Sequence, residues 1–367
     1  MPCIFRTANT TERLLHCSTF PLRRYNQSLQ SDFRPIFRNP HLLTIAANYW
    51  PRKIDQQRFP AVRKHYRIDD RTTVLSLEHQ PENRSRGQIL LLHGLEGCAD
   101  AGYILSFAQH ALLHGFGVHR INSRSCGGTE EICETMYHSG LTTDTLGIVR
   151  EIRNRGIGPI FLVGFSLGGN VALKLAGELG ETDLIAGICA VSTPIDLAAC
   201  VRCTDKPSNF LYARRFLDRL RNRVRRQASH HPHFYSADGL DEVKNIWEFD
   251  DLVTARLFGF GTAANYYATQ SSAGYLDAIR VPTLVVCAKD DPLVPFEVYD
   301  HPAFQSNPFL TLLATEHGGH LGFLSRRKPR FWLDTVALDW IISVLSSHEL
   351  DLNNVEHVTS TGAKSSR

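Results

Sequence analysis

A serine flanked by glycines is the first feature of this sequence that could carry chemistry. Ser166 stands in Gly164-Phe-Ser-Leu-Gly168, the pattern G-x-S-x-G, between an apolar run at Ile160–Val163 and a helical pattern at Asn170–Leu179. Where a strand turns sharply into a helix, glycines two residues before and after a serine let the two backbones approach closely and lift the hydroxyl above the sheet. We therefore predict that Ser166 is a nucleophile at such a turn; the alternative is a simple tight turn.

A serine hydroxyl needs two partners to react at neutral pH, because a histidine must take its proton and a carboxylate must orient that histidine. After a G-x-S-x-G turn, the acid and then the histidine follow in the chain. Asp291 comes just after an apolar run that ends at Ala288, and it is the predicted acid, with Asp290 as the alternative. His320 follows two glycines and is the predicted base, with His317 as the competing candidate.

The negative charge that develops during acyl transfer requires two preorganised N–H donors. One is predicted at Leu167, directly after the nucleophile, and the other at Leu95, in the loop after the apolar run Gln88–Leu92. His93 opens this loop and could be mistaken for the base. We interpret it as a residue that organises the loop.

The elements that must position these residues follow an alternating pattern. Continuous apolar runs are typical of strands buried on both faces of a parallel sheet. Their alternation with helical patterns predicts an α/β protein with a mostly parallel, doubly wound sheet. The G-x-S-x-G turn between one of these strands and a helix makes the α/β-hydrolase fold the predicted version of this architecture. The predicted strands are Thr73–Glu78, Gln88–Leu92, Gly117–Ile121, Ile160–Val163, Ile185–Val191, Thr283–Ala288 and Phe309–Leu313. The clearest predicted helices are Tyr103–His114, Thr143–Arg155 and Asn170–Leu179.

The 367 residues divide into an N-terminal extension at 1–30, a hydrolase domain at 31–347 and a polar tail at 348–367. The extension is basic and is predicted to be either a targeting segment or disordered, and the tail is predicted to be disordered. Strand and helix patterns stop alternating at about residues 194–276, a stretch that is rich in arginine and aromatic residues and has no strand pattern. We predict that this stretch is a helical cap inserted into the domain.

One basic stretch of the predicted cap, residues 211–226, has apolar residues at helical spacing. An interfacial helix that makes peripheral contact with anionic lipid is one interpretation. A cap helix packed on the core, with its arginine face in solvent, is the interpretation that we prefer.

Composition excludes other classes of function. The net charge of +3 does not favour a nucleic-acid-binding protein. No run approaches the roughly 20 apolar residues of a membrane span. The nine irregularly spaced cysteines argue against a disulfide framework and favour a reducing compartment, the cytoplasm.

Several motifs together resemble the YheT-like branch of the α/β-hydrolase superfamily, also called α/β-hydrolase family 4. The resemblance covers about residues 33–342, with Leu43 and Ser125 departing from the usual pattern. The motifs include Asn39–Ile45, His93–Gly97, Asn122–Gly128, Tyr137–Gly140 and Gly318–Phe323. The resemblance implies hydrolysis of carboxylic esters, either esters with short or medium acyl chains or lipid esters. It also implies a second possible reaction, because some members of the family transfer acyl groups to alcohols.

The sequence thus predicts a serine hydrolase that acts on a small-molecule ester. Ser166 forms an acyl-enzyme, His320 acts as base and then as acid while Asp291 orients it, and the N–H groups of Leu95 and Leu167 hold the oxyanion. No metal or organic cofactor is implied. The alternatives are an acyltransferase that uses the same residues and a non-catalytic ligand-binding protein of this fold.

Overall fold

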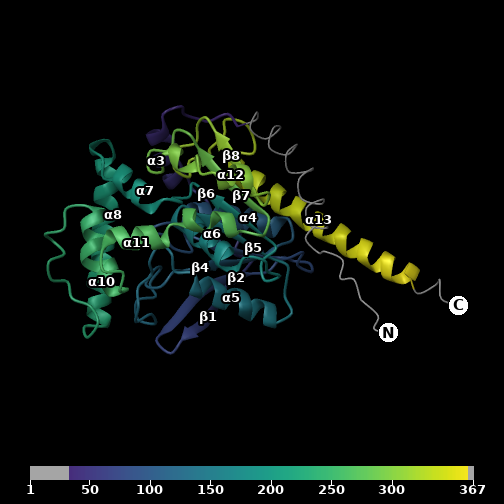
Figure 1. The fold of residues 1–367 in the computed structure, drawn as a ribbon, viewed down its shortest axis with the longest axis horizontal. Helices are drawn as coiled ribbons and strands as arrows, with labels where there is room; N and C mark the ends of the chain where they lie inside the picture. The colour runs from purple at the N-terminus through teal and green to yellow at the C-terminus, as the bar shows by residue number, and fades with distance from the viewer. Residues whose placement is uncertain (1–32, 363–367) are drawn as a thin grey trace, which may run out of the picture.

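The computed structural model describes the backbone of residues 33–362 and the side chains of residues 33–347. The predicted extension at 1–30 lies outside these residues. An eight-stranded sheet with the order β1-β2-β4-β3-β5-β6-β7-β8 forms the centre of the molecule (Figure 1). Its strands are β1 (Val62–Asp69), β2 (Thr72–His79), β3 (Gln88–Leu92), β4 (Gly117–Ile121), β5 (Ile160–Phe165), β6 (Gly187–Val191), β7 (Thr283–Ala288) and β8 (Leu310–Thr315).

The sheet confirms the predicted fold class. From β4 to β8 every neighbouring pair is parallel, whereas β2 pairs antiparallel with both β1 and β4. Each predicted strand is present with small shifts at its ends, and β3, β5, β6 and β7 are buried along their whole length, as the continuous apolar runs indicated. The sequence does not predict β1, because half of its residues are charged and Tyr66 alone is buried.

Helices cover both faces of the sheet, so the sheet is doubly wound. On β3, Ile89 and Leu91 face a cluster with α4 (Gly102–Leu113) and α13 (Trp332–Gly362). Their neighbours Leu90 and Leu92 face a second cluster with α5 (Thr143–Asn154) and α6 (Leu167–Leu179). The side-chain alternation of a strand therefore divides the core into two layers.

The segment between β6 and β7, residues 192–282, forms helices and turns within the described chain, and we call it the cap segment. Figure 1 shows α8, α10 and α11 of this segment together at one side of the sheet. Its elements are α7 (Leu197–Thr204), η1 (Pro207–Asn209), α8 (Phe210–His230), α9 (Ile246–Phe249), η2 (Asp250–Thr254), α10 (Ala255–Leu257), α11 (Ala263–Gln270) and η3 (Ser272–Ala278).

The apolar side of α8 is buried against other side chains of the cap segment and against Met136 of the loop before α5. Leu217, Leu220 and Val224 pack with Met136 and Phe249, among other side chains. The helix is therefore packed, as in the interpretation that we prefer, but in a cluster separate from the two layers around the sheet and with Arg223 buried. This apolar stripe is not free to face a membrane. Within residues 33–362, no helix combines the length and apolar character that a membrane span needs.

Three further helices complete the described chain: α3 (Pro40–Tyr49), η4 (Phe296–Tyr299) and α12 (Ala303–Ser306). The last helix, α13, continues past His348, where we predicted a disordered tail, and ends at Gly362. Adding residues to an existing helix costs far less than starting one, which is why a polar sequence can prolong α13. Residues 363–367 lie outside the described range.

Candidate active site

Ser166 lies on the predicted turn between β5 and α6. Its backbone adopts φ 52° and ψ −119°, a strained conformation for a residue with a side chain. A Cβ atom on Gly164 would lie 2.3 Å from the carbonyl oxygen of Gly168, and one on Gly168 would lie 2.3 Å from that of Leu92. Both glycines are therefore required by close backbone approach, which is the steric reason for the G-x-S-x-G pattern.

The structure brings Ser166, His320 and Asp291 together in one hydrogen-bonded chain. His320 Nε2 lies 3.0 Å from Ser166 Oγ, and His320 Nδ1 lies 2.9 Å from Asp291 Oδ2. Asp291 Oδ1 also accepts the N–H groups of Leu293 (2.8 Å) and Val294 (3.1 Å), which fix the carboxylate in place. An imidazole that donates from Nδ1 to a carboxylate presents the lone pair of Nε2 to the serine hydroxyl.

Asp290 and His317, the competing candidates, form a separate pair. His317 Nδ1 lies 3.0 Å from Asp290 Oδ2, and the side chain of His317 is 39% exposed. Asp290 Oδ1 accepts the N–H of Gly319 at 2.9 Å. This pair holds the loop that carries His320, and no hydrogen bond among the described residues joins it to Ser166.

The loop of His320 rests on α3, far away in the sequence. Thr44 Oγ1 accepts the N–H of His320 at 2.9 Å. Gly319 has φ 55°, and a Cβ atom there would lie 2.6 Å from both Pro40 O and Thr44 Oγ1. The sequence motif at Asn39–Ile45 therefore has a structural role, because α3 supports the loop that carries His320. The spacing of the motif in the sequence does not reveal this contact.

Leu95 and Leu167 line the same cavity as Ser166 and His320. Leu167 begins α6, and the first N–H groups of a helix have no partner inside the helix, which leaves this N–H available to an oxyanion. A Cβ atom on Gly94 would lie 3.1 Å from the Cβ of Ser166, so the backbone beside Leu95 passes directly over the serine.

His93 organises the turn that follows β3, as we interpreted. Its Nδ1 contacts the carbonyl oxygen of Gly94 at 2.8 Å, and its Nε2 accepts the N–H of Ser123 at 3.1 Å. Both contacts require a neutral ring that donates from Nδ1. Burial lowers the pKa of His93 to about 4, which keeps the ring neutral at physiological pH.

A buried ion pair connects this turn with the cap segment. Glu96, at φ 53°, lies 3.1 Å (Oε1) from Nε of Arg223 on α8, and both side chains are almost fully buried. Tyr137 Oη donates to Glu96 Oε1 at 3.1 Å and accepts the N–H of Glu96 at 2.9 Å. Burial lowers the pKa of Arg223, but the nearby Glu96 and Tyr137 outweigh it, so the pKa lies above its usual value. The residue after Leu95 is thus held by the cap.

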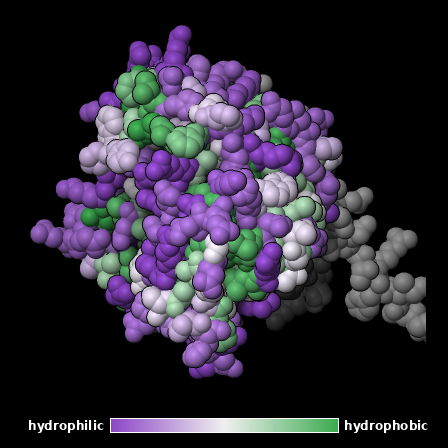
Figure 2. All heavy atoms as spheres, turned by 90° about the vertical axis from the view of Figure 1, so that its left-hand side faces the viewer, coloured by the Kyte–Doolittle hydropathy of each residue, from purple (hydrophilic) through white to green (hydrophobic). Residues whose placement is uncertain are grey.

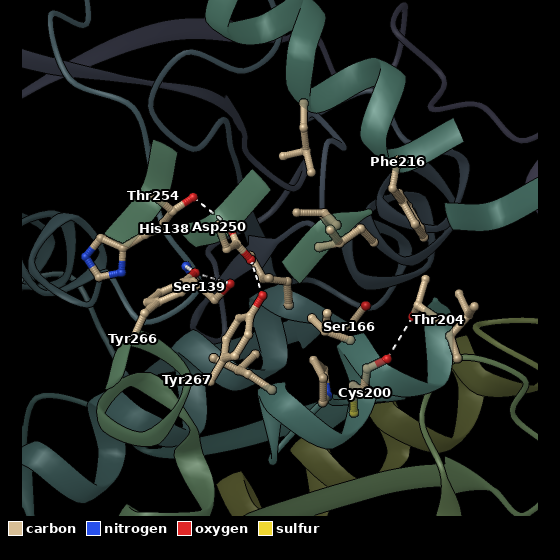
Figure 3. Close-up of a pocket in the computed structure, with 18 of the residues that line it drawn as sticks. His138, Ser139, Ser166, Cys200, Thr204, Phe216, Asp250, Thr254, Tyr266 and Tyr267 are labelled. Atoms are coloured by element: carbon tan, nitrogen blue, oxygen red, sulfur yellow. Dashed lines mark hydrogen bonds between the residues drawn. The ribbon is translucent and has the colours of Figure 1, made fainter. Parts of the chain in front are cut away.

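The cavity above Ser166 has a volume of about 90 Å³, which leaves room for several atoms of a ligand. Figure 3 shows Ser166 between Phe216 and Thr204 on one side and Tyr266 and Tyr267 on the other. Its other lining residues include Leu95, Pro194, Leu197, Val201, Leu220, Ile246 and Leu293. Most of the lining is therefore apolar and comes from the cap segment.

One carboxyl group lies in this cavity without contacting Ser166. Asp250 Oδ1 accepts from Thr254 Oγ1 and Asp250 Oδ2 accepts from Tyr267 Oη, both at 2.6 Å (Figure 3). Burial raises the pKa of Asp250 to about 6 despite these bonds. The carboxyl group can therefore be protonated under mildly acidic conditions. Within the described chain, no group of three or more histidine, cysteine or acidic side chains is arranged to hold a metal ion.

Comparison with known proteins shows which family has this fold and this turn between a strand and a helix. The profile of the alpha/beta hydrolase fold matches residues 88–326, well over half of the chain. The chain belongs to the α/β-hydrolase family. Within this family it is similar to the protein YheT of Escherichia coli (strain K12), with 30% identity over 87% of the chain and 96% of YheT, which confirms the predicted branch.

The chain is also similar to a more distant relative and to solved structures. The chain is 29% identical to the monoacylglycerol lipase of Saccharomyces cerevisiae (strain ATCC 204508 / S288c) over 68% of its length and 57% of the lipase. Among solved structures, 2,6-dihydroxy-pseudo-oxynicotine hydrolase superposes with a TM-score of 0.54 at 20% identity, over 83% of this chain and 72% of the hydrolase. The structural similarity concerns the fold alone.

Proposed function

We propose that this α/β hydrolase cleaves carboxylic esters through an acyl-enzyme on Ser166. The observation that carries the proposal is the chain of contacts from Ser166 Oγ to His320 Nε2 (3.0 Å) and from His320 Nδ1 to Asp291 Oδ2 (2.9 Å). A hydroxyl in such a chain can lose its proton as it attacks.

In the proposed first step, Ser166 Oγ attacks the ester carbonyl while His320 Nε2 takes the hydroxyl proton. Asp291 stabilises the imidazolium that forms. The carbonyl electrons move onto oxygen, which the N–H groups of Leu95 and Leu167 hold. When the carbonyl re-forms, His320 gives its proton to the departing alcohol. Water, activated by His320, then releases the acid and restores Ser166.

The substrate class that we propose is an ester with a short or medium acyl chain, or a lipid ester. The apolar lining of the cavity supports this class, because the burial of an acyl chain against apolar side chains such as Leu197, Phe216 and Leu220 makes the free energy of binding more favourable. The similarity to a monoacylglycerol lipase supports it as well. We propose the cytoplasm as the compartment, on the ground that the described cysteines are free thiols.

The test is intact-mass spectrometry after incubation with a fluorophosphonate. We expect one adduct on the unmodified protein and none on Ser166→Ala. Ser139→Ala is the matched control, because Ser139 lines the same cavity but accepts from Tyr266 Oη at 2.7 Å and has no histidine partner among the described residues; it should still be labelled. No adduct on a correctly folded protein would refute the proposal and favour a non-catalytic ligand-binding role.

A panel of esters graded by acyl length then defines the substrate. The same reactions with added alcohol, analysed for products, separate hydrolysis from acyl transfer, since a transferase yields a new ester in place of the free acid.

A further inference from the structure

Helix α3 exposes large apolar side chains to solvent. Leu42, Ile45 and Tyr49 are 54%, 44% and 68% exposed, and their spacing places them along one side of the helix. On the opposite side, Leu43 and Ala47 are buried in a small core cluster. A helix on the surface of a water-soluble domain normally turns a polar side to solvent. The exposed side of α3 therefore needs an explanation.

The first turn of α8 continues this apolar surface. Phe210 and Leu211 are 57% and 75% exposed. The rings of His41 and Tyr212 stack at 5.8 Å, and Arg215 Nη1 donates to Tyr49 Oη at 3.0 Å, so the two helices lie side by side. We call the exposed side chains Leu42, Ile45, Tyr49, Phe210 and Leu211 the apolar platform.

Figure 2 shows apolar side chains gathered near the top of the face that carries the cap, with hydrophilic side chains around them. Helix α3 lies at the same height in Figure 1. Contiguous apolar surface with a polar rim is typical of interaction sites.

The chain segments around the platform carry much more positive than negative charge. Residues 33–54, 206–217 and 325–331 contain no aspartate or glutamate, although the net charge of the whole protein is only +3. The loop at 326–330 contacts the end of α3, because Arg330 lies 5.5 Å from the ring of Trp50. The exposed cations of these segments are Arg34, Arg38, Lys53, Lys206, Arg215, Arg326, Arg327, Lys328 and Arg330, together with Arg214, which pairs with the exposed Asp218 at 3.9 Å.

We propose that the apolar platform docks on the surface of an anionic lipid bilayer. Leucine, isoleucine and aromatic side chains enter the boundary between headgroups and acyl chains, and the surrounding cations contact lipid phosphates and carboxylates. Charge argues against a second copy of this chain as the occupant, because a symmetric dimer through this surface would place the same cations opposite one another. The buried apolar stripe of α8 takes no part; its exposed first turn does.

The platform adjoins the candidate active site on two sides. Thr44 of α3 accepts the N–H of His320, and Phe216, about one turn after Tyr212 on α8, lines the cavity above Ser166. Docking would therefore hold the cavity beside the membrane, where lipid esters are concentrated. This proposal goes beyond the proposed function, and its test does not depend on turnover.

The experiment is flotation of the full-length protein with vesicles of phosphatidylcholine alone or with about 30% phosphatidylserine, in low and high salt. We expect binding to the anionic vesicles that weakens as salt is raised. The variant Leu42→Asp/Leu211→Asp should bind about tenfold more weakly for each leucine replaced. Val62→Asp is the matched control: Val62 is 63% exposed on β1, which Figure 1 shows at the opposite end of the molecule from α3, and this variant should bind like the unmodified protein.

Equal binding to neutral and anionic vesicles, or unchanged binding of the double variant, would overturn the proposal. So would dimerisation in size-exclusion chromatography that the double variant abolishes, since that result would assign the platform to a second copy. Fluorophosphonate labelling of the double variant in the absence of vesicles should match that of the unmodified protein, which shows that the substitutions act on docking. Failure of labelling in every protein, with vesicle binding intact, would refute the proposed function and leave the docking surface supported.

Discussion

The ion pair between Glu96 and Arg223 makes a quantitative prediction about stability. The two side chains are 5% and 4% exposed, and their charged atoms lie 3.1 Å apart. Removing one partner of a buried pair leaves the other charge without compensation, which costs about 3–5 kcal/mol. We therefore expect Arg223→Met, which conserves much of the side-chain volume, to lower the free energy of unfolding by about this amount.

Glu96→Gln should be costly for the same reason, because it removes the carboxylate that lies 3.1 Å from the buried guanidinium of Arg223. The double variant removes both charges together. Its cost should therefore be smaller than the sum of the single costs by about 2 kcal/mol or more, within the range of coupling energies for residues in contact. Urea unfolding of the four proteins at constant pH measures this coupling.

A surface pair provides the control. Lys64 and Glu151 lie 3.2 Å apart with side chains 39% and 41% exposed. Because solvent screens such pairs, the same cycle there should give a coupling of about 0–1 kcal/mol. Costs at Glu96 and Arg223 that add to within about 0.5 kcal/mol would refute the reasoning, since independent sites behave in that way.

Three further predictions concern the acid, the turn and the pH dependence of stability. Asp291→Asn should lower kcat by about 10³–10⁴-fold, as loss of the orienting carboxylate does in a serine triad, whereas Asp290→Asn should lower kcat less than about tenfold; equal losses would reverse our assignment of the acid. Gly164→Ala should cost at least about 2 kcal/mol of unfolding free energy through its 2.3 Å backbone clash, whereas Gly274→Ala, which meets nothing within 4 Å, should be nearly neutral in the same denaturation assay. The pKa of His93 is about 4 in the folded protein, below its ordinary value of 6.5. As pH falls from 6.5 towards 4 the unfolded state therefore binds the proton first, and the free energy of unfolding decreases. The free energy of unfolding of His93→Gln should depend less steeply on pH in this window, and an unchanged slope would show that His93 is not responsible.

The fold could be predicted from sequence where burial leaves a local mark. Strands buried on both faces are continuous apolar runs, so β3 and β7 were predicted with their observed ends. β1 left no such mark, because one of its faces meets solvent and its charged residues are compatible with a loop. Its identity depends on pairing with β2, an interaction that the local sequence does not encode.

The candidate triad could be predicted for a similar reason. Ser166, Asp291 and His320 each lie in a turn next to a strand, and chain order decides their roles. The link between Glu96 and Arg223 could not be predicted, because it joins a loop to a helix far along the chain. One signal was available: Arg223 follows Leu220 by three residues, which places it on the apolar side of α8 and apart from the solvated arginines.

The support of His320 by α3 has a consequence for the length of the working unit. The family profile covers residues 88–326, but Thr44, which fixes the N–H of His320, precedes that region. A protein trimmed to the matched residues would also lack β2, leaving the backbone of β4 as an unpaired edge open to aggregation. It would lack α13 as well, whose Trp340 and Ile341 belong to the main core cluster. Expression boundaries for this protein should therefore be drawn around α3 and α13, outside the limits of the family profile.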